Sequence, residues 1–447
     1  MLNQSSTEVD FRNFCFEVPY SPDTPIFESG SGIRVKDLRG REYIDAISGV
    51  FVTSFGHSCQ PIIDAMSTQL QKLAFPPPLH SLNKLSISLA SELVELSSLK
   101  FDCAKLFNGG SESIEAALRI TRLYHSAKGN HKKLKILSNY NGYHGSTYGS
   151  LSLTGRADTT RFGPKMPGFI HVWPADCFAC PYDLEYPGCQ TLCASMIEKT
   201  IQAEGPESVA AIFVEPIIHL VGMAVPPKSY FRQLREICDR YNILLVFDEI
   251  VTGFGRTGAF FAADTFEVKP DLMCVGKGVT GGYAPLAAVL MSEGVSAILR
   301  DQKYSYASFA PSHTYAGNPV SAAAGLAAVN LLKSGNYLFK VREQGSYLQE
   351  KLEETVGVYG RVRGMGLLWG CKLNPPNHLI GLNHTRLNLG SHVQQACMKR
   401  GLIIRGQEDM FVIAPAFICS HQDIDRICQL LKEALQEVYT RISRQYS

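Results

Sequence analysis

Long hydrophobic runs and any strong excess of charge are missing from this chain. Its 447 residues contain no stretch of eighteen consecutive apolar residues, so we expect no membrane-spanning helix. The net charge is only +2, which gives no reason to expect nucleic acid or an anionic membrane as a partner. The first residues lack the basic and apolar stretches of a secretory signal, and we find no internal repeat or low-complexity segment.

Cysteine, by contrast, is abundant. Thirteen cysteines are present, and several, such as Cys103 and Cys274, lie inside strand-like apolar runs. Single thiols in such runs fit a reducing compartment better than a disulfide scaffold, so we expect a cytoplasmic protein. With 45% apolar and 19% charged residues, the composition is that of a soluble globular protein. The length exceeds one ordinary domain and allows a large domain with smaller lobes.

Short apolar runs alternate with helical patterns through the middle of the chain. One such pattern covers residues 111–127, where residues at helical spacing share one face. This alternation predicts an α/β fold with a mostly parallel sheet that helices cover on both faces. The seven predicted strands are 103–107, 134–138, 169–173, 210–214, 243–247, 272–276 and 286–291.

The two ends of the chain show other patterns. Residues 33–37 and 43–45 flank a Leu-Arg-Gly-Arg turn and predict a pair of strands. Near the C-terminus, Ser420 and Asp423 form a variant of the helix-capping box ahead of an amphipathic stripe. We therefore expect both ends to share one small α+β lobe. The expected divisions are 1–55 for its N-terminal segment, 56–328 for the large domain and 329–447 for the C-terminal small domain.

The most informative motif pairs an acid with a lysine at the ends of two predicted strands. The run Leu244–Phe247 leads to Asp248, and the run Leu272–Gly276 leads to Lys277. Ligand sites of open α/β sheets lie at the carboxyl ends of the strands. Pyridoxal 5′-phosphate (PLP) needs both groups, a lysine for its aldehyde and an acid for its ring nitrogen. The alternative is a buried Asp–Lys ion pair with no cofactor.

A glycine-containing loop separates the strand 103–107 from the helix that follows it. Its sequence, Phe107-Asn108-Gly109-Gly110-Ser111, places two glycines and a hydroxyl at a helix N-terminus. Free amides and the helix dipole favour a phosphate there. An ordinary glycine turn with a serine cap is the alternative.

A second loop, Asn141–Thr147, holds an aromatic residue between polar neighbours after another predicted strand. Tyr143 in this position suits stacking on a flat ring. The pair Tyr143-His144 also fits a polar cluster in the core, so this motif alone leaves both possibilities open.

Taken together, these motifs resemble the class III PLP-dependent aminotransferases, the fold-type-I group that includes the omega-aminotransferases. The similarity runs from about residue 25 to residue 438. The matching segments are FNGGSESIEAALRITRLYH (107–125), NGYHGSTYGSLSLTG (141–155), VEP (214–216), LLVFDEIVTGFGRTG (244–258), DLMCVGKGVTGGYAPLAAV (271–289) and HTYAGNPVSAAAGLA (313–327).

The resemblance implies a role for each residue around the cofactor ring. Lys277 would be the Schiff-base lysine and the base that moves the substrate proton, and Asp248 would pair with the pyridine nitrogen. Tyr143 and Val251 would pack on the two faces of the ring. His144 would be a polar neighbour of the pocket rather than a metal ligand.

The resemblance also implies a phosphate site and a dimer. Gly110 and Ser111 would bind the phosphate, and Thr314 would reach the phosphate of the neighbouring subunit. A homodimer with active sites at the interface is therefore expected. Glu215 would lie near the substrate pocket, and His219 beside that pocket as a polar neighbour.

The chain departs from the family pattern where substrates are selected. Gly109 replaces the usual small hydroxyl residue, and Leu220 stands near the second acid of ornithine- and aminobutyrate-type enzymes. No arginine directly precedes Ala414-Pro415. Instead Arg405 stands where pyruvate-accepting omega-aminotransferases have a mobile, carboxylate-binding arginine, and Phe51 replaces the large aromatic that walls their pocket.

The predicted activity is transfer of an amino group from an amine or omega-amino acid to a 2-oxo acid such as pyruvate or 2-oxoglutarate. It would proceed in two steps through pyridoxamine phosphate. A PLP-dependent amino-acid 2-epimerase or racemase on the same fold is the main alternative, and a non-catalytic PLP-binding protein is another. The sequence does not name the amine donor.

Four cysteines close together raise a separate question. Their spacing, Cys177-x2-Cys180-x8-Cys189-x3-Cys193, suits a zinc site as well as a cysteine-rich surface loop. Because the family implies no metal there, we expect the loop to be metal-free.

Overall fold

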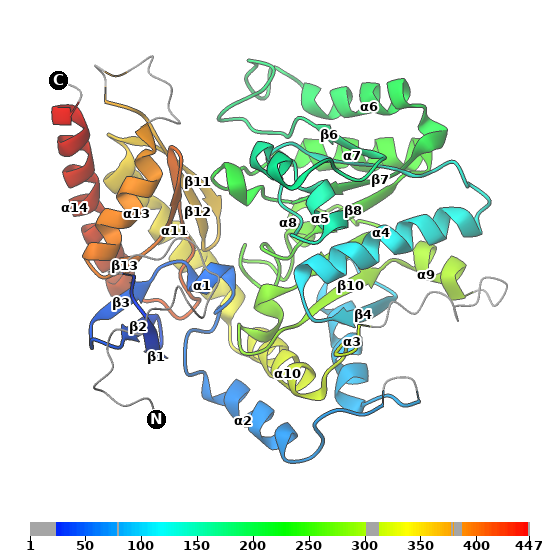
Figure 1. The fold of residues 1–447 in the computed structure, drawn as a ribbon, viewed down its shortest axis with the longest axis horizontal. Coiled ribbons are helices and arrows are strands. Elements are labelled where there is room, and N and C mark those ends of the chain that lie inside the picture. The colour runs from blue at the N-terminus through cyan, green and yellow to red at the C-terminus, as the bar shows by residue number, and fades with distance from the viewer. Residues whose placement is uncertain (1–23, 78–79, 301–312, 377–378, 380–386, 446–447) are drawn as a thin grey trace.

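The computed structural model describes residues 24–77, 80–300, 313–376, 379 and 387–445. Its centre is a seven-stranded sheet, which confirms the predicted α/β fold (Figure 1). The strand β10 runs antiparallel to both of its neighbours, whereas the other pairs in this sheet are parallel. In spatial order the strands are β4 (Cys103–Phe107), β10 (Ala287–Met291), β9 (Leu272–Val275), β8 (Leu244–Asp248), β7 (Val209–Val214), β5 (Lys135–Asn139) and β6 (Phe169–Val172).

The seven predicted strands are confirmed, each with its ends within about one residue of the observed ones. Side chains along a strand point alternately to the two faces of the sheet, so each buried strand contributes side chains to two hydrophobic cores. In β8, Leu244 and Val246 pack into one core, and Leu245 and Phe247 into the other. Helices therefore pack on both faces of the sheet in two layers. The carboxyl ends of the parallel strands lie together at one edge of the sheet.

The first layer consists of α4, α5 and α9, whose apolar residues join the core on one face. The second layer packs on the opposite face and includes α3, α6, α7, α8 and α10. The bounds are α2 (Gln60–Leu70), α3 (Lys84–Leu96), α4 (Gly110–Ala127), α5 (Tyr148–Leu153), α6 (Leu192–Glu204), α7 (Lys228–Tyr241), α8 (Ala262–Phe266), α9 (Glu293–Arg300) and α10 (Pro319–Ser334).

A small lobe lies beside the central sheet, on the left of Figure 1. It contains one sheet of order β1-β2-β3-β13 and another of order β11-β12-β15-β14. The strand β13 from the C-terminal part pairs in parallel with β3 from the N-terminal part, so the two ends of the chain share a sheet. The strands are β1 (Phe27–Ser31), β2 (Arg34–Asp37), β3 (Glu42–Asp45), β11 (Gly360–Met365), β12 (Leu368–Leu373), β13 (Leu402–Ile403), β14 (Arg405–Gln407) and β15 (Met410–Ile413), and the helices are α1 (Ser48–Phe51), α11 (Tyr337–Val356), α13 (Leu389–Lys399) and α14 (His421–Gln445).

The patterns predicted for the chain ends are present. The strands β2 and β3 pair antiparallel, as the turn between them indicated. Ser420 donates from its backbone N and from Oγ to Oδ2 of Asp423, and Asp423 N donates back to Ser420 Oγ, which caps α14. The division into three segments stays a prediction, and its boundary at residue 328 falls inside α10. Within the part of the chain that the structure describes, no helix is long and apolar enough to cross a membrane.

One buried arginine joins the two lobes. Arg256, in the glycine turn after β8, is 1% exposed, and its Nη1 donates to three carbonyls of the small lobe. Its Nη2 lies 3.5 Å from Ser54 Oγ, close to α1, and its Cζ lies 4.8 Å from the ring centroid of Phe417. Burial lowers the pKa of this guanidinium to about 10, which leaves it charged at neutral pH. The three carbonyl acceptors belong to Leu367, Ala414 and Pro415.

We expect Arg256→Lys to destabilise the protein by about 3 kcal/mol. A lysine keeps the charge, but its single ammonium cannot reach several carbonyls and also stack on Phe417, and charged hydrogen bonds contribute about 1.5–3 kcal/mol each. The measurement is the free energy of unfolding from urea denaturation. Arg232→Lys, on the exposed side of α7, is the matched control and should change stability by less than about 0.5 kcal/mol. Equal stability of both variants would contradict the joining role of Arg256.

Candidate active site

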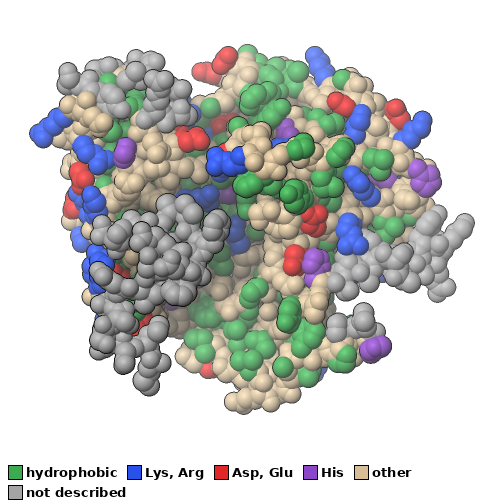
Figure 2. All heavy atoms as spheres, viewed as in Figure 1, with side chains coloured by type: hydrophobic (Ala, Val, Ile, Leu, Met, Phe, Trp, Pro, Cys, Tyr) green, Lys and Arg blue, Asp and Glu red, His purple; other side chains and the backbone are tan. Residues whose placement is uncertain are grey.

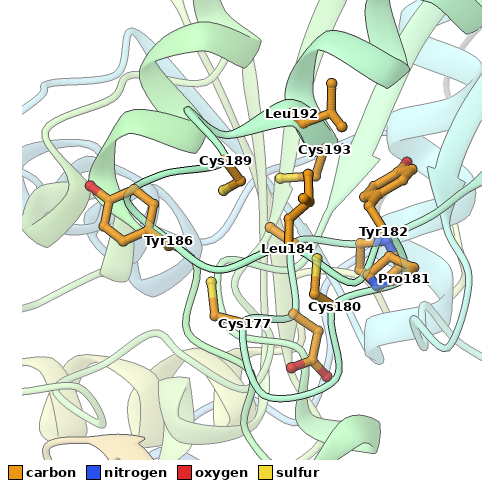
Figure 3. A pocket seen from close by; sticks show the side chains of 12 residues that line it. Cys177, Cys180, Pro181, Tyr182, Leu184, Tyr186, Cys189, Leu192 and Cys193 are labelled. Carbon is orange, nitrogen blue, oxygen red and sulfur yellow. The ribbon is translucent and has the colours of Figure 1, made fainter.

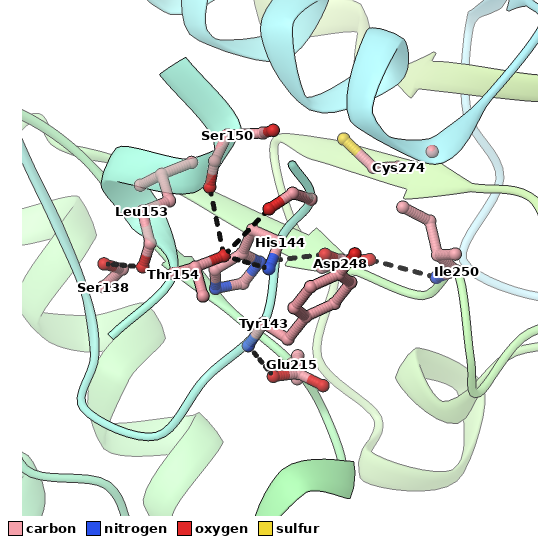
Figure 4. Close-up of polar contacts among 12 residues, drawn as sticks. Ser138, Tyr143, His144, Ser150, Leu153, Thr154, Glu215, Asp248, Ile250 and Cys274 are labelled. Carbon is pink, nitrogen blue, oxygen red and sulfur yellow. Dashed lines mark hydrogen bonds and ion pairs between the residues drawn. The ribbon is translucent and has the colours of Figure 1, made fainter. Parts of the chain in front are cut away.

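The acid and the lysine predicted from the sequence lie at the carboxyl ends of two neighbouring strands. Asp248 is the last residue of β8, and Lys277 follows β9, which pairs with β8 in parallel. Asp248 is nearly buried, and its carboxylate is held from two sides (Figure 4). Oδ2 lies 2.8 Å from His144 Nδ1, and Oδ1 accepts a 3.1 Å hydrogen bond from the Ile250 backbone.

His144 forms a buried hydrogen bond with Asp248 and is affected by its charge. Burial alone would lower the pKa of its imidazole, but the hydrogen bond and the negative charge of Asp248 raise it. The His144 backbone N donates to Thr154 Oγ1 at 3.0 Å, which fixes the loop that carries it (Figure 4). His144 and the Ile250 amide therefore hold the carboxylate of Asp248 in a fixed position at the end of β8.

Lys277 is left without a direct partner. Across the described residues, no hydrogen bond or ion pair reaches its Nζ, so the alternative of a simple Asp–Lys ion pair is not what the structure shows. Nζ lies 5.5 Å from the ring centroid of Phe51. Burial lowers the pKa of Lys277 to about 8, although the charges of Asp248 and Glu215 oppose that shift. An amine with this pKa is partly unprotonated near neutral pH and can act as nucleophile or base.

The glycine loop forms the N-terminus of α4. Gly109 is the residue before the helix, and a methyl group added to it would meet nothing within 4 Å. The first-turn amides of Gly110 and Ser111 have no carbonyl one turn earlier, so they are free to bind an anion. A methyl group on Gly110 would come within 2.8 Å of Ile250 Cδ1. This close packing connects the loop to the residue whose amide holds Asp248.

Tyr143, Val251 and Thr314 occupy different settings. Tyr143 is 38% exposed, and its backbone N donates to Glu215 Oε1 at 2.8 Å. Val251 is buried in an apolar cluster that also contains Phe51. Thr314 is exposed, and the neighbouring His313 lies 3.4 Å from the carboxylate of Glu112, in the first turn of α4. Their roles towards a cofactor ring and a second subunit stay predictions.

A cavity lies beside Phe51, and Arg405 lines it. Arg405 begins β14, and its guanidinium makes no hydrogen bond or ion pair with any residue that the structure describes. Burial lowers its pKa, and the nearby Arg156 acts in the same direction. The cavity therefore offers one uncommitted guanidinium in a largely apolar wall. The lining residues are Phe51, His219, Leu220, Arg405, Gln407, Met410 and Val412.

The pair Glu215–His219 is the part of the site that the sequence did not reveal. His219 Nδ1 lies 2.7 Å from Glu215 Oε2, and both side chains are buried. Burial would raise the pKa of Glu215, but the hydrogen bonds that it accepts from His219 and from the Tyr143 amide lower it, so the carboxylate is ionised. The two residues lie in an irregular loop after β7. Their separation of four positions carries no signal there, because only a helix brings such residues together by rule.

Known proteins similar to this chain are transaminases. A family model described as Aminotransferase class-III matches residues 18–435. Gamma aminobutyrate transaminase 1, mitochondrial, of Solanum lycopersicum is 31% identical over 440 residues, which cover 94% of this chain and 83% of that protein. Vanillin aminotransferase of Capsicum chinense is 31% identical and covers 93% of this chain and 92% of its own.

Solved structures agree with these sequence relatives. A transaminase from a study of directed evolution by ancestral reconstruction has a TM-score of 0.92 at 30% identity, and covers 98% of this chain and 99% of its own. An (S)-enantioselective omega-transaminase from Thermomicrobium roseum has a TM-score of 0.87 at 31% identity over 93% of both chains.

The four clustered cysteines line a second cavity (Figure 3). All four are free thiols. Burial raises the pKa of Cys193 to about 11, so this thiol is protonated at neutral pH. Among the described residues, no three His, Cys, Asp or Glu side chains are arranged to hold a metal ion. That the loop carries no metal stays a prediction.

We expect the purified protein to contain less than about 0.1 zinc per chain after dialysis against a chelator, since a structural zinc site would survive this treatment. Elemental analysis measures the metal directly. The control is Cys177→Ser with Cys193→Ser, which should have the same zinc content as the wild type. About one zinc per chain in the wild type, lost in the double variant, would overturn the prediction.

Proposed function

The chain belongs to the class-III aminotransferase family and transfers amino groups, and we propose that it does so with PLP bound at the strand ends around Asp248 and Lys277. The donor would be an amine or an omega-amino acid, and the acceptor a 2-oxo acid of the pyruvate or 2-oxoglutarate type. The observation that carries the proposal is the amine of Lys277, which has no direct partner in the described chain and a pKa lowered to about 8, beside the fixed carboxylate of Asp248.

The residues present fit the ring nitrogen, the phosphate and the aldehyde of PLP. The carboxylate of Asp248 suits a protonated ring nitrogen, and the free amides at the start of α4 suit the phosphate. The open space at Gly109 leaves room for the phosphate oxygens. The amine of Lys277 is available for the aldehyde carbon, because no neighbour in the described chain binds it.

When bound, PLP supplies an electron sink that stabilises negative charge on the substrate carbon. Asp248 maintains the positive charge of the sink, and its geometry is held by His144 and the Ile250 amide, so little reorganisation accompanies the reaction. Lys277 would take a proton from the substrate carbon and deliver it on the cofactor side of the nitrogen. A pKa of about 8 suits both directions of this transfer.

Two kinds of substrate would alternate in the same pocket. We propose that Arg405 binds the carboxylate of the oxo acid through paired, charged hydrogen bonds. The apolar wall of Phe51, Met410 and Val412 would accept the side chain of an amine that has no carboxylate. Among relatives, one is named for gamma-aminobutyrate and another for vanillin, so the family accommodates both polar and aromatic substrates.

We further propose a homodimer in which Thr314 reaches the phosphate of the second subunit. Thr314 is exposed beside Tyr315, which is 64% exposed and contacts Phe75. Large apolar side chains are also exposed nearby on α2, on α3 and in the segment between them, including Leu70, Ile87 and Leu82, and Figure 2 shows hydrophobic side chains over this part of the surface. A patch of this kind fits an interface between copies of the chain. A cytoplasmic location is also proposed, because the cysteines in the described residues are free thiols.

Lys277→Ala should abolish transamination and leave a folded protein, because no other amine can move the substrate proton. Activity is followed as pyruvate-dependent turnover of an amine donor, and folding by circular dichroism. Borohydride reduction of the wild type should attach the cofactor permanently to Lys277, which peptide mapping locates. Lys269→Ala is the control, because Lys269 is exposed and eight positions earlier in the chain. A cofactor adduct on Lys269, or full activity of Lys277→Ala, would refute the assignment.

Arg405→Ala should damage the oxo-acid half-reaction selectively. We expect the apparent Michaelis constant for pyruvate to rise about 10–100-fold, or roughly 1.4–3 kcal/mol, because two charged hydrogen bonds are lost. The half-reaction of an amine without a carboxylate should change little. It is measured in single turnover as loss of the cofactor absorbance at roughly 400–430 nm.

Arg405→Lys separates charge from geometry in the same experiment. A lysine keeps the charge but cannot bind a carboxylate through two parallel bonds, so an intermediate effect is expected. Equal damage to both half-reactions would instead indicate a structural arginine. An unchanged Michaelis constant for pyruvate would show that another residue holds the carboxylate.

A further inference from the structure

His219 occupies the wall of the substrate cavity and belongs to no motif of the family pattern. Its ring stands edge-on to two aromatic rings, with centroids 5.9 Å from Phe51 and 5.8 Å from Tyr143. The same Phe51 ring lies 5.5 Å from Nζ of Lys277. His219 and the reacting lysine are therefore neighbours of one phenylalanine. His219 and Arg405 also line the same cavity beside that phenylalanine.

The hydrogen bond to Glu215 decides which nitrogen of His219 carries the proton. Glu215 is ionised and can only accept, and its Oε1 already accepts from the Tyr143 backbone. Nδ1 of His219 therefore donates to Oε2 at 2.7 Å. Burial lowers the pKa of His219 despite the charge of Glu215, and the nearby cations Lys277 and Arg405 act in the same direction. The ring is thus neutral, and its Nε2 carries a lone pair.

That lone pair has no partner in the described part of the chain. Nδ1 is committed to Glu215, and no described residue donates to Nε2. The walls around it are apolar at Phe51, Met410 and Val412. Gln407 also lines the cavity, and its Nε2 donates one hydrogen to the Leu220 carbonyl at 3.1 Å, which leaves its carbonyl oxygen and one amide hydrogen for a ligand. The cavity therefore offers acceptors next to the donor Arg405.

The charges of the cavity restrict which hydrogen-bond donor fits. Arg405 is a cation that the described residues leave unpaired, and Lys277 lies against the same phenylalanine as His219. A second ammonium group on the substrate would be repelled by the Arg405 guanidinium. A hydroxyl group is uncharged, donates one hydrogen bond and fits between apolar side chains.

We propose that His219 is a specificity-determining residue that accepts a hydrogen bond from a hydroxyl group on the amine substrate, so that hydroxylated amines are the preferred donors. This inference rests on the amino-group transfer at Lys277 proposed above. A neutral acceptor fixed by an ionised carboxylate selects for a hydroxyl because a methyl group in its place leaves the nitrogen buried and unpaired.

Pairs of amines that differ only in a terminal hydroxyl or methyl group test the proposal. The pairs are 3-amino-1-propanol with butylamine, 4-amino-1-butanol with pentylamine, and 5-amino-1-pentanol with hexylamine. Each is mixed with the PLP-loaded enzyme, and the rate of absorbance loss is measured in single turnover. The readout is the ratio of the second-order rate constants within a pair. The wild type should favour the amino alcohol in at least one pair by about tenfold, the size of one hydrogen bond to a buried acceptor.

Substitutions at His219 separate hydrogen bonding from packing. His219→Leu should reduce the ratio to about one, whereas His219→Gln keeps an acceptor and should retain part of it. Because His219→Leu leaves Glu215 buried without its partner, the double variant Glu215→Gln with His219→Leu removes that charge and should give the same ratio as His219→Leu. Each ratio is internal to one variant, so loss of total activity does not affect it.

The outcomes separate this inference from the proposed function. Equal rates within every pair for the wild type, or an unchanged ratio in His219→Leu, would overturn the role of His219 and leave the transaminase proposal intact. A wild-type preference for putrescine over the amino alcohols would also overturn it, because a second ammonium would then be the selected group. If no amine, including L-alanine, changed the absorbance of the PLP-loaded enzyme, the proposed function itself would fail.

Discussion

The buried guanidinium of Arg256 is the constraint on which the site depends. It lies in the turn that follows Asp248, and it binds carbonyls that belong to the small lobe and a hydroxyl close to α1. Phe51 ends α1, and Arg405 lies in the sheet whose last strand leads to Ala414 and Pro415. The guanidinium of Arg256 thus fixes the positions of Phe51 and Arg405 relative to Asp248 at the end of β8. The desolvation of that cation is offset by several carbonyl dipoles rather than by a carboxylate.

The second constraint is the order of the central sheet. Because β8 and β9 are parallel neighbours, the residues that follow them emerge at the same edge, where the loop after β5 brings His144 as well. The N-terminus of α4 reaches the same edge, since Ile250 contacts Gly110 and holds Asp248 through its amide. The positions of acid, lysine and anion site thus follow largely from strand order, and Lys277 in addition has a left-handed backbone conformation, with a φ of 42°.

Much of the fold and of the site could be predicted from the sequence, because these features depend on residues that are close together in the chain. Strands buried on both faces give short apolar runs, and an ionisable residue at the end of such a run, as at Asp248 and Lys277, is conspicuous. The capping of α14 by Ser420 and Asp423 is equally local. The partnership of Glu215 with His219 could not be predicted, because it depends on the course of an irregular loop. Arg256 was visible only as part of a motif, and its contacts join segments more than a hundred residues apart.

The hydrogen bonds that Glu215 accepts affect how Arg405 can alternate between two kinds of substrate. Both of its oxygens are engaged, one by the Tyr143 amide and one by His219, so the carboxylate does not need Arg405 as a counter-ion. An arginine that must leave an ion pair before it binds a substrate carboxylate gives up part of its binding energy in doing so. Arg405 makes no such pair within the described chain. An exchange between a substrate with a carboxylate and an apolar substrate therefore requires almost no free energy to release Arg405 from another residue.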